Sequence, residues 1–464
     1  MRSNIKKVFW FYFLLFFILI VYLLFFTFFK SDTIIGNPYN PRVKASQNNN
    51  IKRGAILDKS FNIIAQTKES RVYNYDDVFA HIVGFISNGG YGIESKYNFE
   101  LQTLNNSLLQ QLNLQINKNK VLQGNSIVLT IDKDLQQYCY DKLKNKKGAI
   151  VVMDSTTGKI LAMVSSPSFN PNNVSKNWDT IISDTENNPL VNRATQGLYP
   201  PASVFKIITA ATFIENYNDW EDYTYTCKGY ETYEDIKIDC FDKKAHKEIN
   251  LEQALAVSCN SFFVNLSSII TPEQLSNVAN RALFNKPLGF PLDYNKSSFS
   301  LDINSPIDEI MQTYIGQGKT LTTPLHIALI GCGVANNGLI MSPYIVDSTL
   351  DYKGKTITKN MPKNLTTAFS IDTAQTIKNM LKKVVTNGTG VKAQIKNISI
   401  SAKTGTAQID NEKDHTWFLG IAPTENPNIV VSIIFENSGS HSNIVETARD
   451  IISFCKPMLN KIEK

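Results

Sequence analysis

The hydrophobic and polar positions divide the chain into three parts. Residues 8–29 carry no charge and consist mostly of Phe, Leu and Ile, which suits a helix crossing a bilayer core of about 30 Å. Arg2, Lys6 and Lys7 precede this run, so the positive-inside rule predicts a cytoplasmic N-terminus and an extracellular remainder. A cleaved signal peptide is the alternative. Because the run is too long for one and no small-x-small site follows it, we expect a retained single-pass anchor in the cell membrane.

Between the anchor and residue 148, the pattern predicts a tether followed by a small mixed α/β domain. Residues 31–50 are polar and contain Pro and Asn, which favours an extended linker. Short apolar runs separated by turns then predict strands and helices. The expected strands are 53–58, 63–65, 81–85 and 125–131, and the expected helices begin at Gly92 and Asp132. No group of catalytic side chains occurs here, so we interpret this part as a spacer.

Residues 148–464 predict a larger α+β domain. The apolar runs 149–154 and 160–164 flank a Ser-Thr-Thr-Gly-Lys turn, which is typical of a β-hairpin. Further strands are expected at 398–401, 416–421 and 429–435, and helices after Ser203, Leu251 and Pro324 and over 448–462. Because strands occur at both ends of this part, we expect a central antiparallel sheet covered by helices. The predicted domains are 1–30, 31–147 and 148–464.

Composition excludes some classes of protein. The 464-residue chain has a net charge of +6 and no long basic tract, which argues against nucleic-acid binding. Six cysteines without a Cys-x-x-Cys motif and five histidines without ligand spacing predict no metal and no cofactor. Cys227 and Cys240 flank a polar loop, and a disulfide or two free thiols are both open. Gly318-Lys319-Thr320 suggests a phosphate-binding loop, but Thr313 stands where that loop needs glycine.

The stretch that suggests chemistry is Tyr-Pro-Pro-Ala-Ser-Val-Phe-Lys at 199–206, ahead of an apolar helical run. The prolines favour a helix start that places Ser203 in the first turn. Lys206 lies three residues later on the same face, where its amine can take the proton of a serine nucleophile. A serine here is also a common helix cap, and Ser-x-x-Lys occurs elsewhere in the chain, so the motif alone favours the cap.

Two further motifs occur in settings that suit a cleft. Ser258 and Asn260 lie two residues apart at an expected turn between helices, although each also fits a helix cap. The expected strand 398–401 is followed by Lys403, Thr404, Gly405 and Thr406. A lysine cation, two hydroxyls and a small residue at a strand can bind a peptide carboxylate and align the peptide as an added strand. An exposed edge strand with no ligand is the alternative.

The order Ser-x-x-Lys, Ser-x-Asn, Lys-Thr-Gly resembles that of the penicillin-binding proteins and serine β-lactamases. The chain is most similar to class B penicillin-binding proteins, the membrane-anchored peptidoglycan transpeptidases. Residues 53–58, 92–94, 148–167 and 316–324 also resemble segments of that family. The resemblance implies a penicillin-binding transpeptidase domain at 148–464 and a pedestal domain before it. One departure follows Asp58, where Lys-Ser-Phe replaces the usual basic residue and Asn-Gly; this alters a scaffold turn.

The resemblance implies an acyl-serine mechanism. Ser203 would attack the carbonyl of the penultimate D-alanine of a stem peptide, and Lys206 would accept its proton. For that, burial or the nearby Lys403 cation must lower the lysine pKa from about 10.4. Ser258 would relay a proton to the leaving amine, and an amine of a neighbouring strand would then take the acyl group. β-Lactams would acylate the same serine.

The resemblance also implies how the substrate is held. Asn260 would bind the substrate amide, and Lys403 with Thr404 and Thr406 would bind the terminal carboxylate beside Gly405. The backbone N–H groups of Ser203 and Thr406 would form an oxyanion hole.

Three competing functions share these motifs. A β-lactamase would release the acyl group to water, and a β-lactam sensor would need more than the single predicted membrane span. A non-catalytic cell-wall protein would be expected to have lost a motif residue, and none is lost. Use of water in place of an amine would give D,D-carboxypeptidase activity. The expected partners are stem peptides, β-lactams, the membrane and a glycan polymerase or other cell-wall synthesis protein.

Overall fold

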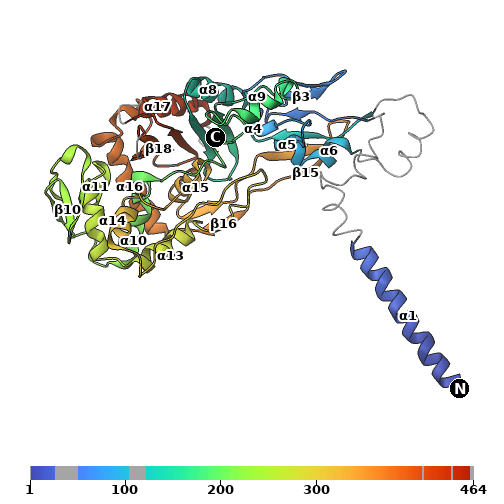
Figure 1. The fold of residues 1–464 in the computed structure, drawn as a ribbon, viewed down its shortest axis with the longest axis horizontal. Coiled ribbons are helices and arrows are strands. Elements are labelled where there is room, and N and C mark those ends of the chain that lie inside the picture. Colours follow the sequence, from blue (N-terminus) through green and yellow to red (C-terminus); the bar gives the residue numbers. More distant parts are fainter. Residues whose placement is uncertain (1, 27–50, 104–121, 410–411, 440–442, 460–464) are drawn as a thin grey trace.

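The computed structural model describes residues 2–26, 51–103, 122–409, 412–439 and 443–459. Helix α1 (Arg2–Phe25) extends away from a body of helices and strands (Figure 1). Among the described residues, Ile5–Phe25 is the one helix long and apolar enough to cross a membrane, and its side chains are all exposed. This helix starts earlier than the expected run 8–29, whose last three residues lie outside the described part.

A five-stranded antiparallel sheet forms the centre of the larger domain. Its strand order is β17 (Ser401–Ala407), β18 (His415–Ala422), β19 (Ile429–Phe435), β7 (Gly148–Asp154) and β8 (Ile160–Ser166). Every neighbouring pair is antiparallel. The first and last parts of the domain therefore combine in one sheet, as expected from the sequence, and β17 occupies one edge.

Alternate side chains of these strands enter two separate cores. In β7, Val151 points into the larger core, whereas Ile150 and Val152 point into the smaller one. Both faces are covered, which explains why β7 is apolar along its whole length. The smaller core is closed by α8 (Lys133–Leu143) and α17 (Ile444–Phe454). The larger core includes α10 (Lys206–Asn216), α15 (Pro324–Ala335) and α16 (Ile371–Asn387), beneath the sheet in Figure 1.

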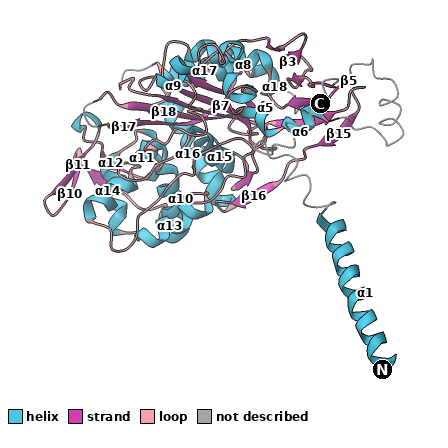
Figure 2. Ribbon diagram, turned by 45° about the vertical axis from the view of Figure 1, so that its right-hand side comes forward, coloured by secondary structure: helices cyan, strands magenta, loops and turns pink. Residues whose placement is uncertain are grey.

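A second, six-stranded sheet joins the larger domain to the N-terminal part (Figure 2). Its order is β15 (Thr356–Lys359), β14 (Val346–Leu350), β6 (Ser126–Leu129), β2 (Ile56–Leu57), β3 (Ile63–Thr67) and β4 (Arg71–Tyr73). The hairpin of β14 and β15 lies late in the sequence, yet β14 pairs with β6. Conversely, α8 precedes residue 148 and packs on the central sheet. The domain boundary at residue 147 stays a prediction. Helix α8 and strand β14 both make contacts across this boundary.

Four local expectations were wrong. Residues 81–85 contain a helix, α4 (Ala80–Val83), because a short buried apolar run has no period that separates strand from helix. The helix expected from Gly92 is broken into α5 (Gly92–Lys96) and α6 (Asn98–Gln102). The strand expected at 398–401 instead begins at Ser401 and contains the Lys-Thr-Gly motif. The last helix ends at Phe454 and is followed by the short α18 (Lys456–Leu459).

The remaining elements are short, and several line the site described below. They are β1 (Ile51–Lys52), β5 (Leu122–Gln123), α9 (Trp178–Ser183), β9 (Tyr225–Cys227), β10 (Tyr230–Tyr233), β11 (Ile236–Asp239), β12 (Lys247–Ile249), α11 (Leu251–Ala256), α12 (Asn260–Asn265), α13 (Pro272–Arg281), α14 (Ile307–Tyr314), β13 (Leu339–Met341) and β16 (Asn364–Thr367).

The buried carboxylate of Glu94 connects three segments of the N-terminal part. Glu94 accepts a hydrogen bond from Arg53 Nε at 2.5 Å on one oxygen and from Arg71 Nε at 2.6 Å on the other. The Glu94 side chain is fully buried, and both arginine side chains are less than a tenth exposed. This triad ties helix α5 to β4 and to the segment ahead of β2. The two N-terminal segments singled out in the sequence therefore meet in space.

The turn after Asp58 keeps a left-handed residue although its sequence departs from the usual one. The Asp58 carboxylate accepts hydrogen bonds from the backbone of Ser60 and Asn62. Phe61 has a φ of +65° at the position where glycine is usual, and its side chain is exposed. The carboxylate cap thus holds the turn despite the loss of glycine.

Candidate active site

The stretch that carries Ser203 is held between the sheet edge and a glycine turn. Ser203 lies in a 3₁₀ turn (Ala202–Val204) just ahead of α10, rather than in the first turn of that helix. The Ala202 N–H donates to the Gly316 carbonyl at 2.8 Å, and Trp417 Nε1 donates to the Pro200 carbonyl at 2.9 Å. Ser203 is partly exposed, whereas every other residue from 201 to 213 is buried. Its hydroxyl is therefore the polar group that this segment presents to solvent.

Backbone strain flanks the serine. Ala202 adopts a φ of +50°, which is costly for a residue with a Cβ. This turn also packs closely against Gly405 of β17. A Cβ on Gly405 would lie 3.3 Å from the Ala202 Cβ and 3.4 Å from the Ser203 nitrogen. The absence of a side chain at Gly405 therefore lets the turn that bears Ser203 pack closely against β17.

Lys206 is completely buried and reaches the Ser-x-Asn motif. Its Nζ donates to the Ser258 carbonyl at 2.8 Å and to Asn260 Oδ1 at 2.7 Å, and it lies 3.4 Å from Ser258 Oγ. In the described part of the chain, none of its hydrogen bonds goes to Ser203. Burial lowers the pKa of the Lys206 ammonium to about 8. About a tenth of the amine is thus neutral at pH 7, far more than for a lysine with the ordinary pKa of about 10.4.

Ser258 and Asn260 occupy the expected turn between two helices. Helix α11 ends at Ala256, and α12 begins at Asn260 with Cys259 as its N-cap. Ser258 has a φ of +58°, a second left-handed residue in the site. Asn260 Nδ2 donates to the Asp239 carbonyl at 3.0 Å, so the amide is oriented from both ends.

Lys403 is a second buried lysine that contacts Ser258. Its Nζ donates to Ser258 Oγ at 2.8 Å and to the Thr404 carbonyl at 2.9 Å, and the side chain is completely buried. Burial, and next the Lys206 cation, lower the pKa of Lys403 well below its usual value. Neither lysine forms an ion pair with a carboxylate within the described ranges. Ser258 Oγ therefore lies between two amines that cannot both easily carry a charge.

Strand β17 offers its free edge beside Ser203. The Thr406 carbonyl accepts from Gln317 Nε2 at 3.2 Å, and the Thr404 carbonyl accepts from Lys403, so both point away from β18. In an antiparallel strand the N–H and C=O of one residue point to the same side, so the Thr406 N–H also faces this open edge. Thr404 Oγ1 lies 2.5 Å from Thr389 Oγ1.

The three sequence motifs thus meet between the turn that bears Ser203, the turn at Ser258 and the edge of β17. Together they bring in all eight predicted site residues: Ser203, Lys206, Ser258, Asn260, Lys403, Thr404, Gly405 and Thr406. Comparison with known proteins shows which family uses this arrangement. A model of the penicillin binding protein transpeptidase domain matches residues 148–453. The chain belongs to that family. This confirms the family expected from the order of the three motifs.

Individual members agree in sequence and fold. The chain is 25% identical to the peptidoglycan D,D-transpeptidase MrdA of Acinetobacter baumannii, over 89% of this chain and 70% of that protein. The D,D-transpeptidase domain of a peptidoglycan glycosyltransferase from Eggerthella lenta superposes with a TM-score of 0.81 at 30% identity, covering 89% of this chain and 100% of that one. Penicillin-binding protein A of M. tuberculosis, as an imipenem acyl-enzyme complex, gives 0.80 at 25% identity, covering 87% and 98%.

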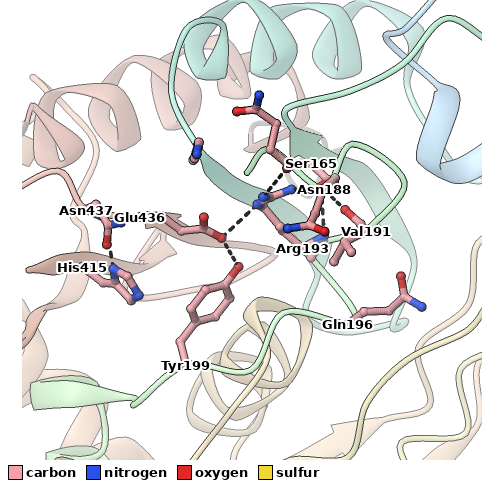
Figure 3. Close-up of polar contacts among 12 residues, drawn as sticks. Ser165, Asn188, Val191, Arg193, Gln196, Tyr199, His415, Glu436 and Asn437 are labelled. Atoms are coloured by element: carbon pink, nitrogen blue, oxygen red, sulfur yellow. Dashed lines mark hydrogen bonds and ion pairs between the residues drawn. The ribbon is translucent and has the colours of Figure 1, made fainter. Parts of the chain in front are cut away.

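The sequence analysis of this penicillin-binding protein did not predict one network of polar contacts near the site (Figure 3). Arg193 Nε donates to Glu436 at 2.9 Å, and the Tyr199 hydroxyl donates to the same carboxylate oxygen. The Tyr199 ring meets His415 and Trp417 edge-on. Because Tyr199 begins the stretch that carries Ser203, the network anchors the entrance to that stretch. Arg193 and Glu436 lie 243 residues apart and show no sequence pattern that would pair them.

The second missed feature is a cluster of metal-ligand side chains. Cys227, Cys240, His246 and Cys259 place one donor atom each within 4.8 Å of the others. The sequence led us to expect no metal site because no Cys-x-x-Cys occurs, but β9 to β12 and the start of α12 bring these distant residues together. All six cysteines are free thiols here, including the pair Cys227 and Cys240 that was left open.

Proposed function

We propose that this protein is a membrane-anchored peptidoglycan D,D-transpeptidase in which Ser203 is the nucleophile. The observation that carries the proposal is the convergence of two buried lysines on Ser258 beside a partly exposed serine and an open strand edge. β-Lactams are expected to acylate the same serine, since they present a reactive carbonyl to it. No cofactor takes part in this chemistry.

The first step forms an acyl-enzyme. Ser203 Oγ attacks the carbonyl carbon of the penultimate D-alanine, and its proton passes to the neutral amine of Lys206. Lys206 begins α10 one turn after Ser203, and its lowered pKa makes the neutral form accessible. The peptide C–N bond then breaks, and the terminal D-alanine leaves with a proton relayed through Ser258. Ser258 suits this role because its hydroxyl contacts both Lys206 and Lys403.

Strand β17 supplies the groups that hold the substrate. A stem peptide laid along its free edge would find the Thr406 N–H beside the Ser203 N–H, and these two donors would stabilise the oxyanion. Lys403, Thr404 and Thr406 would hold the terminal carboxylate, and Asn260 would hold a substrate amide. Each lost oxyanion-hole donor is expected to cost about 3–4 kcal/mol of transition-state stabilisation.

The second step transfers the acyl group. An amine of a neighbouring stem peptide attacks the acyl carbon, loses its proton to Lys206, and Ser203 Oγ leaves as the hydroxyl. The product is a cross-link. Water in place of the amine would give a D,D-carboxypeptidase.

The test is covalent labelling of the full chain in detergent with a fluorescent penicillin, followed by a denaturing gel. We expect a band for the wild type and none for Ser203→Ala. Ser453→Ala is a matched control, because Ser453 and Lys456 form another Ser-x-x-Lys pair outside the site. A wild-type band that persists for hours supports a transpeptidase over a β-lactamase. Absence of a band from folded wild-type protein would overturn the proposal.

The membrane arrangement is part of the same proposal. Helix α1 would cross the membrane with Lys6 and Lys7 in the cytoplasm and the catalytic domain outside, next to its substrate. A glycan polymerase is the partner expected to supply uncross-linked strands. A protease added to cells whose outer layer has been removed should cleave the catalytic domain of this protein. A catalytic domain that stays fully protected from the protease would contradict this topology.

A further inference from the structure

The free edge of strand β17 is covered at one point, the carbonyl of Thr406. Gln317 Nε2 donates to this carbonyl at 3.2 Å. A carbonyl oxygen can only accept, so the amide nitrogen of Gln317, and not its amide oxygen, faces the strand. A side chain of the protein therefore lies on the strand edge that is expected to hold the stem peptide.

The backbone around Gln317 fixes where this side chain starts. The Gly316 carbonyl accepts from the Ala202 N–H at 2.8 Å, and Gly316 has a φ of +78°. A Cβ on Gly316 would overlap the Ala202 oxygen, so only glycine allows the two turns to approach this closely. The Gln317 N–H donates to the Gln312 carbonyl at 2.9 Å. Gln317 thus projects from a turn that is anchored to the turn bearing Ser203.

The side chain of Gln317 is held weakly by comparison with its backbone. The residue is half-buried, and within the described residues its side chain makes one hydrogen bond, the one to Thr406. By contrast, the fully buried Gln136 donates from its side chain to two backbone carbonyls. A single neutral hydrogen bond at a partly exposed position contributes little net free energy, so a ligand can replace it.

The Thr406 carbonyl is also a group that a bound stem peptide needs. When a strand adds to an antiparallel neighbour, two residues that face each other exchange both of their N–H···O bonds. If the Thr406 N–H donates to the carbonyl of the penultimate D-alanine, the N–H of that D-alanine points at the Thr406 carbonyl. The Gln317 amide therefore takes the position of this substrate N–H.

We propose that Gln317 is a specificity-determining residue that caps the substrate strand and is replaced by an N–H of the ligand. The proposal rests on the proposed function and adds a selection step to it. A ligand with an N–H next to the reacting carbonyl remakes the hydrogen bond that it breaks. A ligand without this N–H would leave the Thr406 carbonyl without a donor if it displaced Gln317, and an acceptor left without a partner is costly.

Two β-lactams test this selection, because they differ at the carbon next to the reacting carbonyl. Benzylpenicillin carries an acylamino N–H there, whereas penicillanic acid sulfone carries hydrogen only. For benzylpenicillin, Gln317→Ala should raise the acylation rate of the full-length protein by about 2–10-fold, because one neutral hydrogen bond need no longer be broken. The rate for penicillanic acid sulfone should stay the same, since Gln317 can remain on Thr406 beside it.

Both rates are measured as the loss of subsequent labelling by a fluorescent penicillin. Their ratio within one preparation does not depend on the fraction of folded protein, so a loss of stability in the variant cannot imitate the result. Gln317→Met keeps a side chain of similar length without a donor and should repeat the effect of Gln317→Ala. Gln394→Ala is the matched control, because Gln394 also donates to a backbone carbonyl, that of Val385 at 2.9 Å, outside the site. It should keep the wild-type ratio.

Three results would overturn the selection by Gln317. An equal rise for both β-lactams would mean that the side chain only obstructs the site. An equal fall would mean that it positions the turn that bears Ser203, and unchanged rates would mean that the contact with Thr406 has no role in binding. In each case the acylation of Ser203 in the wild type would still stand. Absence of acylation from the wild type would instead refute the proposed function itself.

Discussion

The protein buries cations in two regions and treats them in opposite ways. In the pedestal domain, Arg53 and Arg71 share one buried carboxylate, Glu94. In the candidate active site, Lys206 and Lys403 are buried around the neutral hydroxyl of Ser258, without a carboxylate partner in the described part of the chain. The pedestal therefore compensates buried charge, whereas the site leaves it uncompensated.

The choice of residue follows from this difference. Arginine stays charged even when buried and binds carboxylates with a fixed fork, which suits a permanent structural link. Lysine loses its proton readily when buried, so an unpaired lysine becomes a base. The comparison predicts that the site lysines cost stability and supply reactivity, while the pedestal triad supplies stability alone.

Lys206→Met tests the role of the buried lysines in the candidate site, and it should have the largest effect on the acylation rate. Loss of the general base is expected to slow penicillin acylation by about 10²–10⁴-fold. A pKa lowered from 10.5 to about 8 means that the protonated lysine costs the fold about 3 kcal/mol at pH 7. The free energy of unfolding should therefore stay the same or rise. Timed labelling and urea unfolding measure the two quantities.

The control for this variant is Lys378→Met, which removes a mostly buried lysine on α16 that is not among the site residues. Its acylation rate should match the wild type. A Lys206→Met protein that is less stable by several kcal/mol would show that the amine serves the fold, contrary to the comparison.

Glu94→Gln tests the role of the Arg53–Glu94–Arg71 triad in stability. It leaves two arginines buried without an anion, and removal of one partner of a buried ion pair costs about 3–5 kcal/mol. Urea unfolding measures the loss. Glu69→Gln is the control, because Glu69 is exposed and the change should stay within about 0.5 kcal/mol. Folded Glu94→Gln protein should acylate at the wild-type rate; a large decrease would mean that the pedestal also controls the site.

The pH dependence of acylation and of stability tests whether Lys206 acts as an unpaired buried base. Acylation should rise with pH with an apparent pKa of about 8, and below that pH the rate should fall about tenfold per pH unit as Lys206 gains its proton. The folded pKa lies below the unfolded value, so the unfolded chain binds more protons between about pH 8 and 10.5. Stability should therefore rise with pH in that window.

Lys206→Met tests the assignment of both pH effects. The variant should lose the part of the rise in stability between about pH 8 and 10.5 that comes from Lys206, while the part that comes from the lowered pKa of Lys403 stays. A rise of the same size in the variant would assign the effect to another group. Acylation and unfolding followed over one series of buffers give both profiles.

The candidate site residues could be predicted from the sequence because each motif is local and its setting is recognisable. Ser203 with Lys206, Ser258 with Asn260, and Lys403 to Thr406 are each a few residues long, and their order points to one family. Their secondary structure was less certain: the Lys-Thr-Gly motif lies inside β17 rather than after a strand.

Features that depend on distant pairing could not be predicted in this way. The clustered side chains of Cys227, Cys240, His246 and Cys259 lie at or next to the ends of strands and of a helix, and the β14–β15 hairpin joins a sheet whose other strands precede residue 130. Arg193 and Glu436 are ordinary charged residues until the loop after α9 meets the end of β19. Such contacts follow from the fold and not from any local pattern.

The smallest expected effect concerns a third region with a buried cation, that of Arg193, whose carboxylate partner also binds Tyr199. Tyr199→Phe keeps the ion pair but releases the start of the stretch that carries Ser203. We expect a loss of about 1.5–3 kcal/mol in stability from the missing hydrogen bond to a charged group, with acylation slowed a few-fold.

Tyr140→Phe separates the two effects, because Tyr140 donates an equivalent hydrogen bond to Asp77 away from the site. Both variants should lose similar stability in urea unfolding, while only Tyr199→Phe should acylate more slowly. If the two acylate equally fast, the Arg193–Glu436–Tyr199 network belongs with the pedestal triad as a purely structural use of a paired cation. If they differ, compensated charge also positions the nucleophile, and the contrast between the two regions applies to the lysines alone.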